Sequence, residues 1–146
     1  ENPPEMPLIS RVPGNVTGTI VGGNLSSFVD TLGTPFEVDT TGRILFIEET
    51  HEAASRVYRM IAHLIHAGKF NDCIGIIMGE CSGCYANYGK SYDDIINEVI
   101  VPLGKPLMTN LASGHGLYKM AIPIGAVTNL NTYNNTLTVL EPTVSL

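Results

Sequence analysis

The sequence predicts a mixed α/β fold in which helices cover a sheet and a further β layer is attached. Short apolar runs typical of buried strands alternate with amphipathic segments of helical spacing, and the C-terminal part is rich in strand patterns. The 146 residues suffice for one domain with a single hydrophobic core. With 44% hydrophobic and 15% charged residues, the composition is that of a folded chain, not of a disordered one.

The first predicted elements are a strand, a short helix and a second strand. Residues 16–23 alternate in polarity and end in a turn on two glycines, and Asn24 is placed to cap a helix that stops before Gly33. After a turn, residues 43–48 form a near-continuous apolar run. Such a run is typical of a strand that is covered on both faces.

The strongest helical pattern covers residues 50–67. Thr50 is the predicted N-cap and Gly68 ends the helix. His63 and His66 lie on this helix without a carboxylate at metal-ligand spacing, so we interpret them as solvated or packed side chains.

The second half of the chain continues the alternation. Residues 73–80 read as another buried strand, and residues 105–111 as a third one. Between them, Ser91 and Asp94 have the spacing of a capping box at the start of a helix that Pro102 ends.

Residues 120–141 supply the added β layer. They contain two strand patterns joined at Asn134 and Asn135, a pair typical of a tight turn. We therefore expect a hairpin near the end of the chain.

The charge distribution excludes several classes of protein. The net charge is −6 and no stretch concentrates lysine and arginine, so we expect no nucleic-acid partner and no anionic-membrane surface. No apolar run approaches the roughly 18 residues of a membrane span.

Residues 1–15 are proline-rich and acidic, without the regions of a signal peptide and without an initial Met. We interpret them as a linker to residues 16–146, the single domain, and expect the chain to be part of a longer protein.

Three cysteines are present, with Cys81 and Cys84 in the motif CSGC and Cys73 upstream. A structural zinc site needs four ligands, usually as two such pairs, and the sequence has no second pair. The surroundings of a thioredoxin-like redox motif are not visible either. We interpret the cysteines as small buried residues or bystanders and expect no metal and no cofactor.

Two features could carry chemistry. The strand at 43–48 runs directly into Glu48 and Glu49, which are either solvated residues at a strand end or carboxylates facing a cleft. His115 is flanked by glycines in a loop after another strand, where a histidine is exposed and can titrate near neutral pH. His115 is then either a polar loop residue or a general base that a carboxylate such as Glu48 orients.

A nucleophile for such a pair is not found in this chain. No G-x-S-x-G elbow occurs in the sequence. Ser113 lies only two residues from His115 and is too constrained to serve, and nothing in the sequence activates Cys81 or Cys84.

The chain resembles the C-terminal domain of the LD-carboxypeptidases, also called muramoyltetrapeptide carboxypeptidases, and of the related microcin C immunity peptidases. The resemblance covers nearly the whole sequence. It is carried, in order, by GTIVGGNLSSFVDTLGTPFEVD (18–39), GRILFIEE (42–49), RMIAHLIHAGKF (59–70), GIIMGE (75–80), and SGHG (113–116) before AIPIGA (121–126).

This resemblance implies a swivelling β/β/α-type domain of a two-domain serine peptidase. In the family, the N-terminal domain carries the nucleophilic serine, and the C-terminal domain supplies the Glu and His of a Ser-Glu-His triad. Glu48 matches the triad glutamate and His115 the triad histidine, whereas Glu49 matches no catalytic position and is interpreted as a helix-start residue. The nucleophile-bearing domain is not contained in these residues.

The function implied by the resemblance is release of the terminal D-alanine from a murein tetrapeptide, in peptidoglycan recycling in the bacterial cytoplasm. We expect the isolated chain to be inactive, the full-length protein to form a homodimer, and an apolar patch to lie beside the pair where the missing domain docks. Two alternatives stay open: a microcin C-type immunity peptidase acting on an aminoacyl-nucleotide, and a non-catalytic binding or dimerisation module. The presence of both Glu48 and His115 argues against the module.

Overall fold

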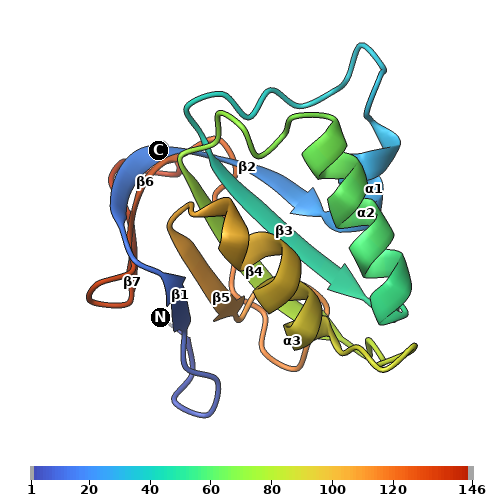
Figure 1. The fold of residues 1–146 in the computed structure, drawn as a ribbon. Helices are drawn as coiled ribbons and strands as arrows, with labels where there is room; N and C mark the ends of the chain where they lie inside the picture. Colours follow the sequence, from blue (N-terminus) through green and yellow to red (C-terminus); the bar gives the residue numbers. More distant parts are fainter. Residues whose placement is uncertain (1, 145–146) are drawn as a thin grey trace.

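A computed structural model describes residues 2–144 as a seven-stranded sheet with helices on one face (Figure 1). The strands are β1 (Ile9–Val12), β2 (Asn15–Asn24), β3 (Ile44–Thr50), β4 (Gly75–Ser82), β5 (Leu107–Leu111), β6 (Val127–Asn131) and β7 (Thr136–Val139). The helices are α1 (Leu25–Asp30), α2 (Ala54–His66) and α3 (Tyr92–Ile95), the last continued by a π-helical stretch (Ile96–Ile100) and a 3₁₀ turn (Val101–Leu103).

The sheet joins a parallel half to an antiparallel half through β2. The strand order is β1-β5-β4-β3-β2-β6-β7, and the pairs β2–β3, β3–β4 and β4–β5 are parallel. In β2, residues 20–24 pair with β3, whereas residues 15–19 pair with β6. The strand therefore bends from one half into the other (Figure 1). The mixed α/β prediction is confirmed, and the expected extra β layer is a continuation of the same sheet.

Each face of the sheet has its own core, because neighbouring residues of β3 point to opposite sides. Leu45 and Ile47 pack with the helices, in a cluster that includes Ile61 and Leu64 of α2. On the other face the core lies under β6, and its buried members are Ile20, Ile44, Phe46, Ile77, Met108, Leu111 and Leu130. The apolar run at 43–48 thus reflects burial on both faces, as predicted.

The interpretation of residues 1–15 as a linker is wrong for much of that segment. Residues 9–12 form β1, which pairs antiparallel with β5 at the edge of the sheet. Asn2 is also fixed, because its Nδ2 donates to the carbonyl of Asn110 at 2.6 Å and its Oδ1 accepts from the N–H of Ala112 at 3.0 Å. A four-residue edge strand between prolines carries little periodicity, so its pattern resembles that of a linker.

Two predicted element boundaries are also wrong. β2 does not turn at its glycines: Gly22 pairs with Phe46 of β3 at a φ of +118°, and a Cβ at this position would overlap the Phe46 carbonyl. Thr50 is the last residue of β3, not a helix cap, and α2 begins after Ala53 without a side-chain cap. Here the backbone is held instead by the segment after β4, since the N–H of Ala54 donates to the Tyr85 carbonyl.

The other predicted caps and the hairpin are confirmed. Asn24 Oδ1 accepts from the N–H of Ser27 at 3.1 Å at the start of α1. Ser91 and Asp94 form the reciprocal capping box of α3. The turn between β6 and β7 contains Asn135 at a positive φ of 61°.

The cysteines are not all bystanders. Cys81 and Cys84 form a disulfide across the turn that follows β4, whereas Cys73 is a buried free thiol, as expected. Burial raises the pKa of the Cys73 thiol, so this side chain is an inert part of the core. Within residues 2–144, no helix has the length and apolar character that a membrane crossing requires.

Candidate functional site

The candidate site lies at the carboxyl ends of the parallel strands β3, β4 and β5, which run side by side (Figure 1). In open α/β sheets this edge is where ligands usually bind. Glu48 stands near the end of β3, and the loop carrying His115 follows β5 and folds back over the strand ends.

The structure brings the two predicted site residues together. Nδ1 of His115 and Oε2 of Glu48 are 3.0 Å apart, although the residues are separated by 67 positions in the chain. The Glu48 side chain is 7% exposed and the His115 side chain 56%. A carboxylate accepts hydrogen bonds, so this contact assigns the ring proton to Nδ1 and leaves Nε2 able to accept a proton. The arrangement can therefore serve as an oriented general base.

One glycine beside His115 makes this contact possible. Gly114 has a φ of +127°, and a Cβ at that position would lie 2.6 Å from Oε2 of Glu48. A side chain there would occupy the space of the carboxylate, and the backbone conformation itself favours glycine. The predicted need for glycine in this loop is thus met by a specific close approach.

A pocket of about 350 Å³ opens beside Glu48. It is lined by Gly23, Asn24, Phe46, Glu48, Ser113, Gly114, Lys119, Met120, Ala121, Ile122 and Ile124. Ile124 is 53% exposed, and Leu117 in the His115 loop is 87% exposed. Of these two exposed apolar side chains, Ile124 lines the same pocket as Glu48.

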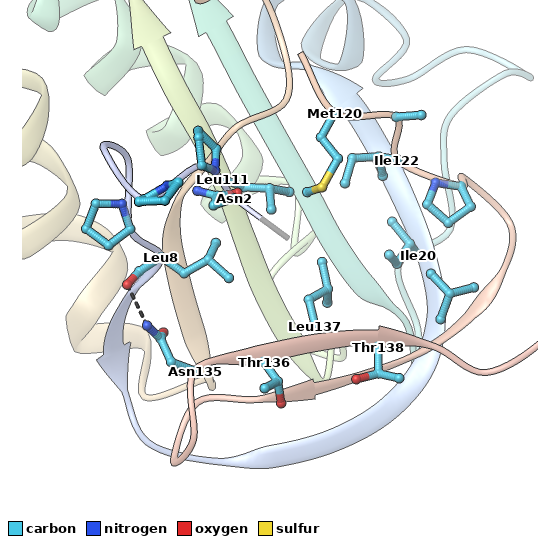
Figure 2. A pocket seen from close by; sticks show the side chains of 16 residues that line it. Asn2, Leu8, Ile20, Leu111, Met120, Ile122, Asn135, Thr136, Leu137 and Thr138 are labelled. Atoms are coloured by element: carbon cyan, nitrogen blue, oxygen red, sulfur yellow. Dashed lines mark hydrogen bonds between the residues drawn. The ribbon is translucent and has the colours of Figure 1, made fainter. Parts of the chain in front are cut away.

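A second pocket of about 550 Å³ shares Met120, Ala121 and Ile122 with the first one (Figure 2). Figure 2 shows Leu8, Ile20, Leu111 and Leu137 around it, and the dashed line marks the bond from Asn135 Nδ2 to the Leu8 carbonyl. None of its lining residues is ionisable, so we do not assign proton-transfer chemistry to it.

Glu49 points to the opposite face of β3 and has a structural role. Its Oε1 accepts from Asn24 Nδ2 and from the N–H of Thr50, and its Oε2 accepts from the N–H and the hydroxyl of Ser26. Burial alone would raise the pKa of Glu49, but these hydrogen bonds together hold it below its usual value. The prediction that Glu49 stands at the start of the next helix is wrong, because Glu49 lies within β3. Its Oε2 instead accepts hydrogen bonds at the start of α1, which is distant in the sequence.

Sequence reasoning missed Tyr92. Its hydroxyl donates to the carbonyl of Gly79 at 3.3 Å, next to the strand ends. Burial, and then the nearby charges of Glu48 and Glu49, raise the pKa of Tyr92, so that the phenol stays neutral. In the sequence this residue is only the first apolar position of a helix, and no local pattern relates it to the site.

The nucleophile candidates in this chain do not fit. Cys81 and Cys84 are bonded to each other and offer no free thiol. Ser113 is buried, and within residues 2–144 the only hydrogen-bond partner of the His115 ring is Glu48. The described residues also contain no group of three side chains that could hold a metal ion.

Comparisons with known proteins identify the family of this chain. Residues 17–130 match the LD-carboxypeptidase C-terminal domain. The chain belongs to the LD-carboxypeptidase family, as its C-terminal domain. It is 38% identical over 142 residues to the probable murein peptide carboxypeptidase of Bacillus subtilis, covering 95% of this chain and 44% of that protein. It is 24% identical over 135 residues to the microcin C7 self-immunity protein of Escherichia coli, covering 90% of this chain and 39% of that protein.

Solved structures show the same fold for this LD-carboxypeptidase domain. A muramoyltetrapeptide carboxypeptidase from Oxalobacter formigenes superposes with a TM-score of 0.79 at 27% identity, covering 92% of this chain and 50% of that one. The microcin C7 self-immunity protein superposes with a TM-score of 0.86 at 21% identity, covering 94% and 42%. The chain therefore spans half or less of the length of these relatives.

Proposed function

We propose that this domain supplies Glu48 and His115 to the Ser-Glu-His triad of a serine carboxypeptidase that releases terminal D-alanine from murein tetrapeptide. The observation that carries the proposal is the 3.0 Å contact between His115 and the buried Glu48. The similarity to a probable murein peptide carboxypeptidase, 38% identical over 142 residues, supports the choice of substrate.

In this mechanism His115 takes the proton of a serine on the other domain as that serine attacks the peptide carbonyl. His115 then returns the proton to the amine of the departing D-alanine. Glu48 keeps the ring proton on Nδ1 and stabilises the imidazolium that forms between the two steps. Glu48 is almost fully buried, so it acts through the histidine and not on the substrate.

A D-alanine release assay on the full-length protein tests this proposal. We expect His115→Ala to abolish turnover and Glu48→Gln to lower kcat by roughly 10²–10⁴-fold, since the ring tautomer is no longer fixed. KM should change little, because both groups act mainly in the transition state. His66→Ala, at an exposed position on α2, is the matched histidine control and should keep full activity.

The isolated 146-residue chain should release no D-alanine, because it lacks the nucleophile. Turnover by the isolated chain, or full activity of Glu48→Gln in the full-length protein, would contradict the triad. A parallel assay with an aminoacyl-nucleotide separates the two branches of the family: cleavage of that substrate alone would identify an immunity peptidase.

The assembly and location implied by the resemblance belong to the same proposal. The full-length protein is expected to be a homodimer in the bacterial cytoplasm that acts in peptidoglycan recycling. Light scattering on the full-length protein would give its mass, and a monomer would remove the dimer from the proposal.

A further inference from the structure

We propose that Glu80 is a positioning residue of this site, which holds the His115 loop in place by packing its carboxylate against Gly116. The inference rests on the proposed function only in that His115 must be oriented to act. The contact itself lies within this chain and can be tested without catalysis.

The end of β4 is shaped to present this carboxylate. Ile47 pairs with Met78 and Glu49 with Cys81, so Glu48 of β3 faces both Gly79 and Glu80 of β4. Two residues of β4 thus lie opposite one residue of β3, which defines a β-bulge. Bulges change the direction of side chains and are frequent beside active sites. The bulge thus places Glu48 and Glu80 together at the strand ends.

Each of the two carboxylates packs against one of the two glycines that flank His115. Gly114 lies against Glu48, and a Cβ on Gly116 would overlap the carboxylate of Glu80. Gly116 is buried, and its φ lies outside the left-handed region. Its backbone could therefore accept a side chain, and the carboxylate of Glu80 is the obstacle. The histidine loop is clamped on both sides of His115.

Glu80 contacts Gly116 by van der Waals packing and not by a hydrogen bond to its Oε1. Oε1 of Glu80 is buried and has no hydrogen-bond partner among the described residues. A neutral amide of the same shape should preserve this packing, whereas a shortened side chain should not. Since a buried charged oxygen without a donor is unfavourable, the amide should not cost stability.

A rescue experiment tests the contact on this chain. Gly116→Ala is made alone and together with Glu80→Ala, and the His115 ring signals are followed by ¹H–¹⁵N NMR, assigned through His115→Gln. Alone, Gly116→Ala should shift these signals and lower Tm. In the Glu80→Ala background, the additional shift and the additional loss in Tm should fall by at least half. If Gly116→Ala does not fold alone, folding of the double variant is the rescue.

Two controls separate positioning from general packing. Gly18→Ala also creates a side-chain overlap, with Ile74, and Glu80→Ala should not relieve it. Glu80→Gln should keep the His115 signals and a Tm at or above that of the native chain, whereas Glu80→Ala should move the signals. Equal effects of Gly116→Ala in both backgrounds, or unchanged His115 signals in Glu80→Ala, would overturn the proposal.

These results are independent of the D-alanine assay. A positive rescue in a protein without carboxypeptidase activity would refute the proposed function and leave the positioning contact standing. A failed rescue in a protein with carboxypeptidase activity would refute the positioning contact and leave the proposed function standing.

Discussion

Replacement of Glu49 by glutamine should be among the most damaging changes to this domain that leave the catalytic pair itself intact. The two carboxylate oxygens accept four hydrogen bonds, at 3.0 Å from Asn24, 2.9 and 2.6 Å from Ser26, and 2.9 Å from Thr50. An amide keeps the shape but loses the charge, and in either orientation its NH₂ group faces a backbone N–H. Hydrogen bonds to a charged group each contribute about 1.5–3 kcal/mol, and a buried donor left unpaired costs about 1–3 kcal/mol. We therefore expect Glu49→Gln to lower the free energy of unfolding by about 2–4 kcal/mol.

The loss should depend on pH in a defined direction. The hydrogen bonds lower the pKa of Glu49 in the folded state. A carboxyl group whose folded-state pKa is depressed stabilises the protein above its unfolded pKa, about 4.3, and this contribution disappears as the pH falls through the folded value. The unfolding free energy of the native chain should therefore exceed that of Glu49→Gln most at pH 7. This difference in unfolding free energy should narrow below about pH 4.

Urea unfolding followed by circular dichroism at pH 7 and at pH 3 to 4 measures both effects. Glu52→Gln is the matched control, since the Glu52 side chain pairs with the exposed Arg56 side chain. This variant should lose less than about 1 kcal/mol of unfolding free energy. Equal losses in the two variants at pH 7 would refute the assigned role of Glu49. A Glu49→Gln difference that is the same at both pH values would refute its electrostatic basis.

One substitution tests the core, and a thiol titration of the native sequence tests the disulfide. Ile61→Ala on α2 removes a fully buried side chain from the helix-side core and should destabilise the domain by about 2–5 kcal/mol, measured by urea unfolding. Thiol titration of the oxidised, unfolded chain should find one free cysteine, Cys73, and titration after reduction should find three; three free thiols before reduction would show that Cys81 and Cys84 are not bonded.

The sequence was informative where local patterns decide the structure. Strands buried on both faces, such as β3, leave a continuous apolar run, and the Asn24 cap and the Ser91–Asp94 capping box involve residues only three apart. The pairing of Glu48 with His115 was one of two alternatives that the residues left open, and the family resemblance favoured it. Their separation of 67 positions leaves no local signal.

The remaining features depend on contacts between distant segments. β1 forms because β5 offers it an edge for pairing. α2 starts at Ala54 because the segment after β4 holds the backbone there. Glu49 looks like the start of the next helix, yet it caps α1 because β3 runs beside that helix start. The packing of Glu80 on Gly116 likewise requires the sheet register, which the pattern of single strands does not contain.

The difference in burial between Glu48 and His115 divides the proposed chemistry between them. A carboxylate that is 7% exposed cannot be approached by a peptide, whereas a histidine ring that is 56% exposed can. The glycines on both sides of His115 fit this division, because each lets a carboxylate approach the loop without covering the ring. A ring fixed at Nδ1 and open to solvent elsewhere suits a base whose substrate proton comes from another domain. Orientation of the proposed base is thus built into this chain, through the contact of His115 with Glu48 and the close approach of the two carboxylates to the flanking glycines.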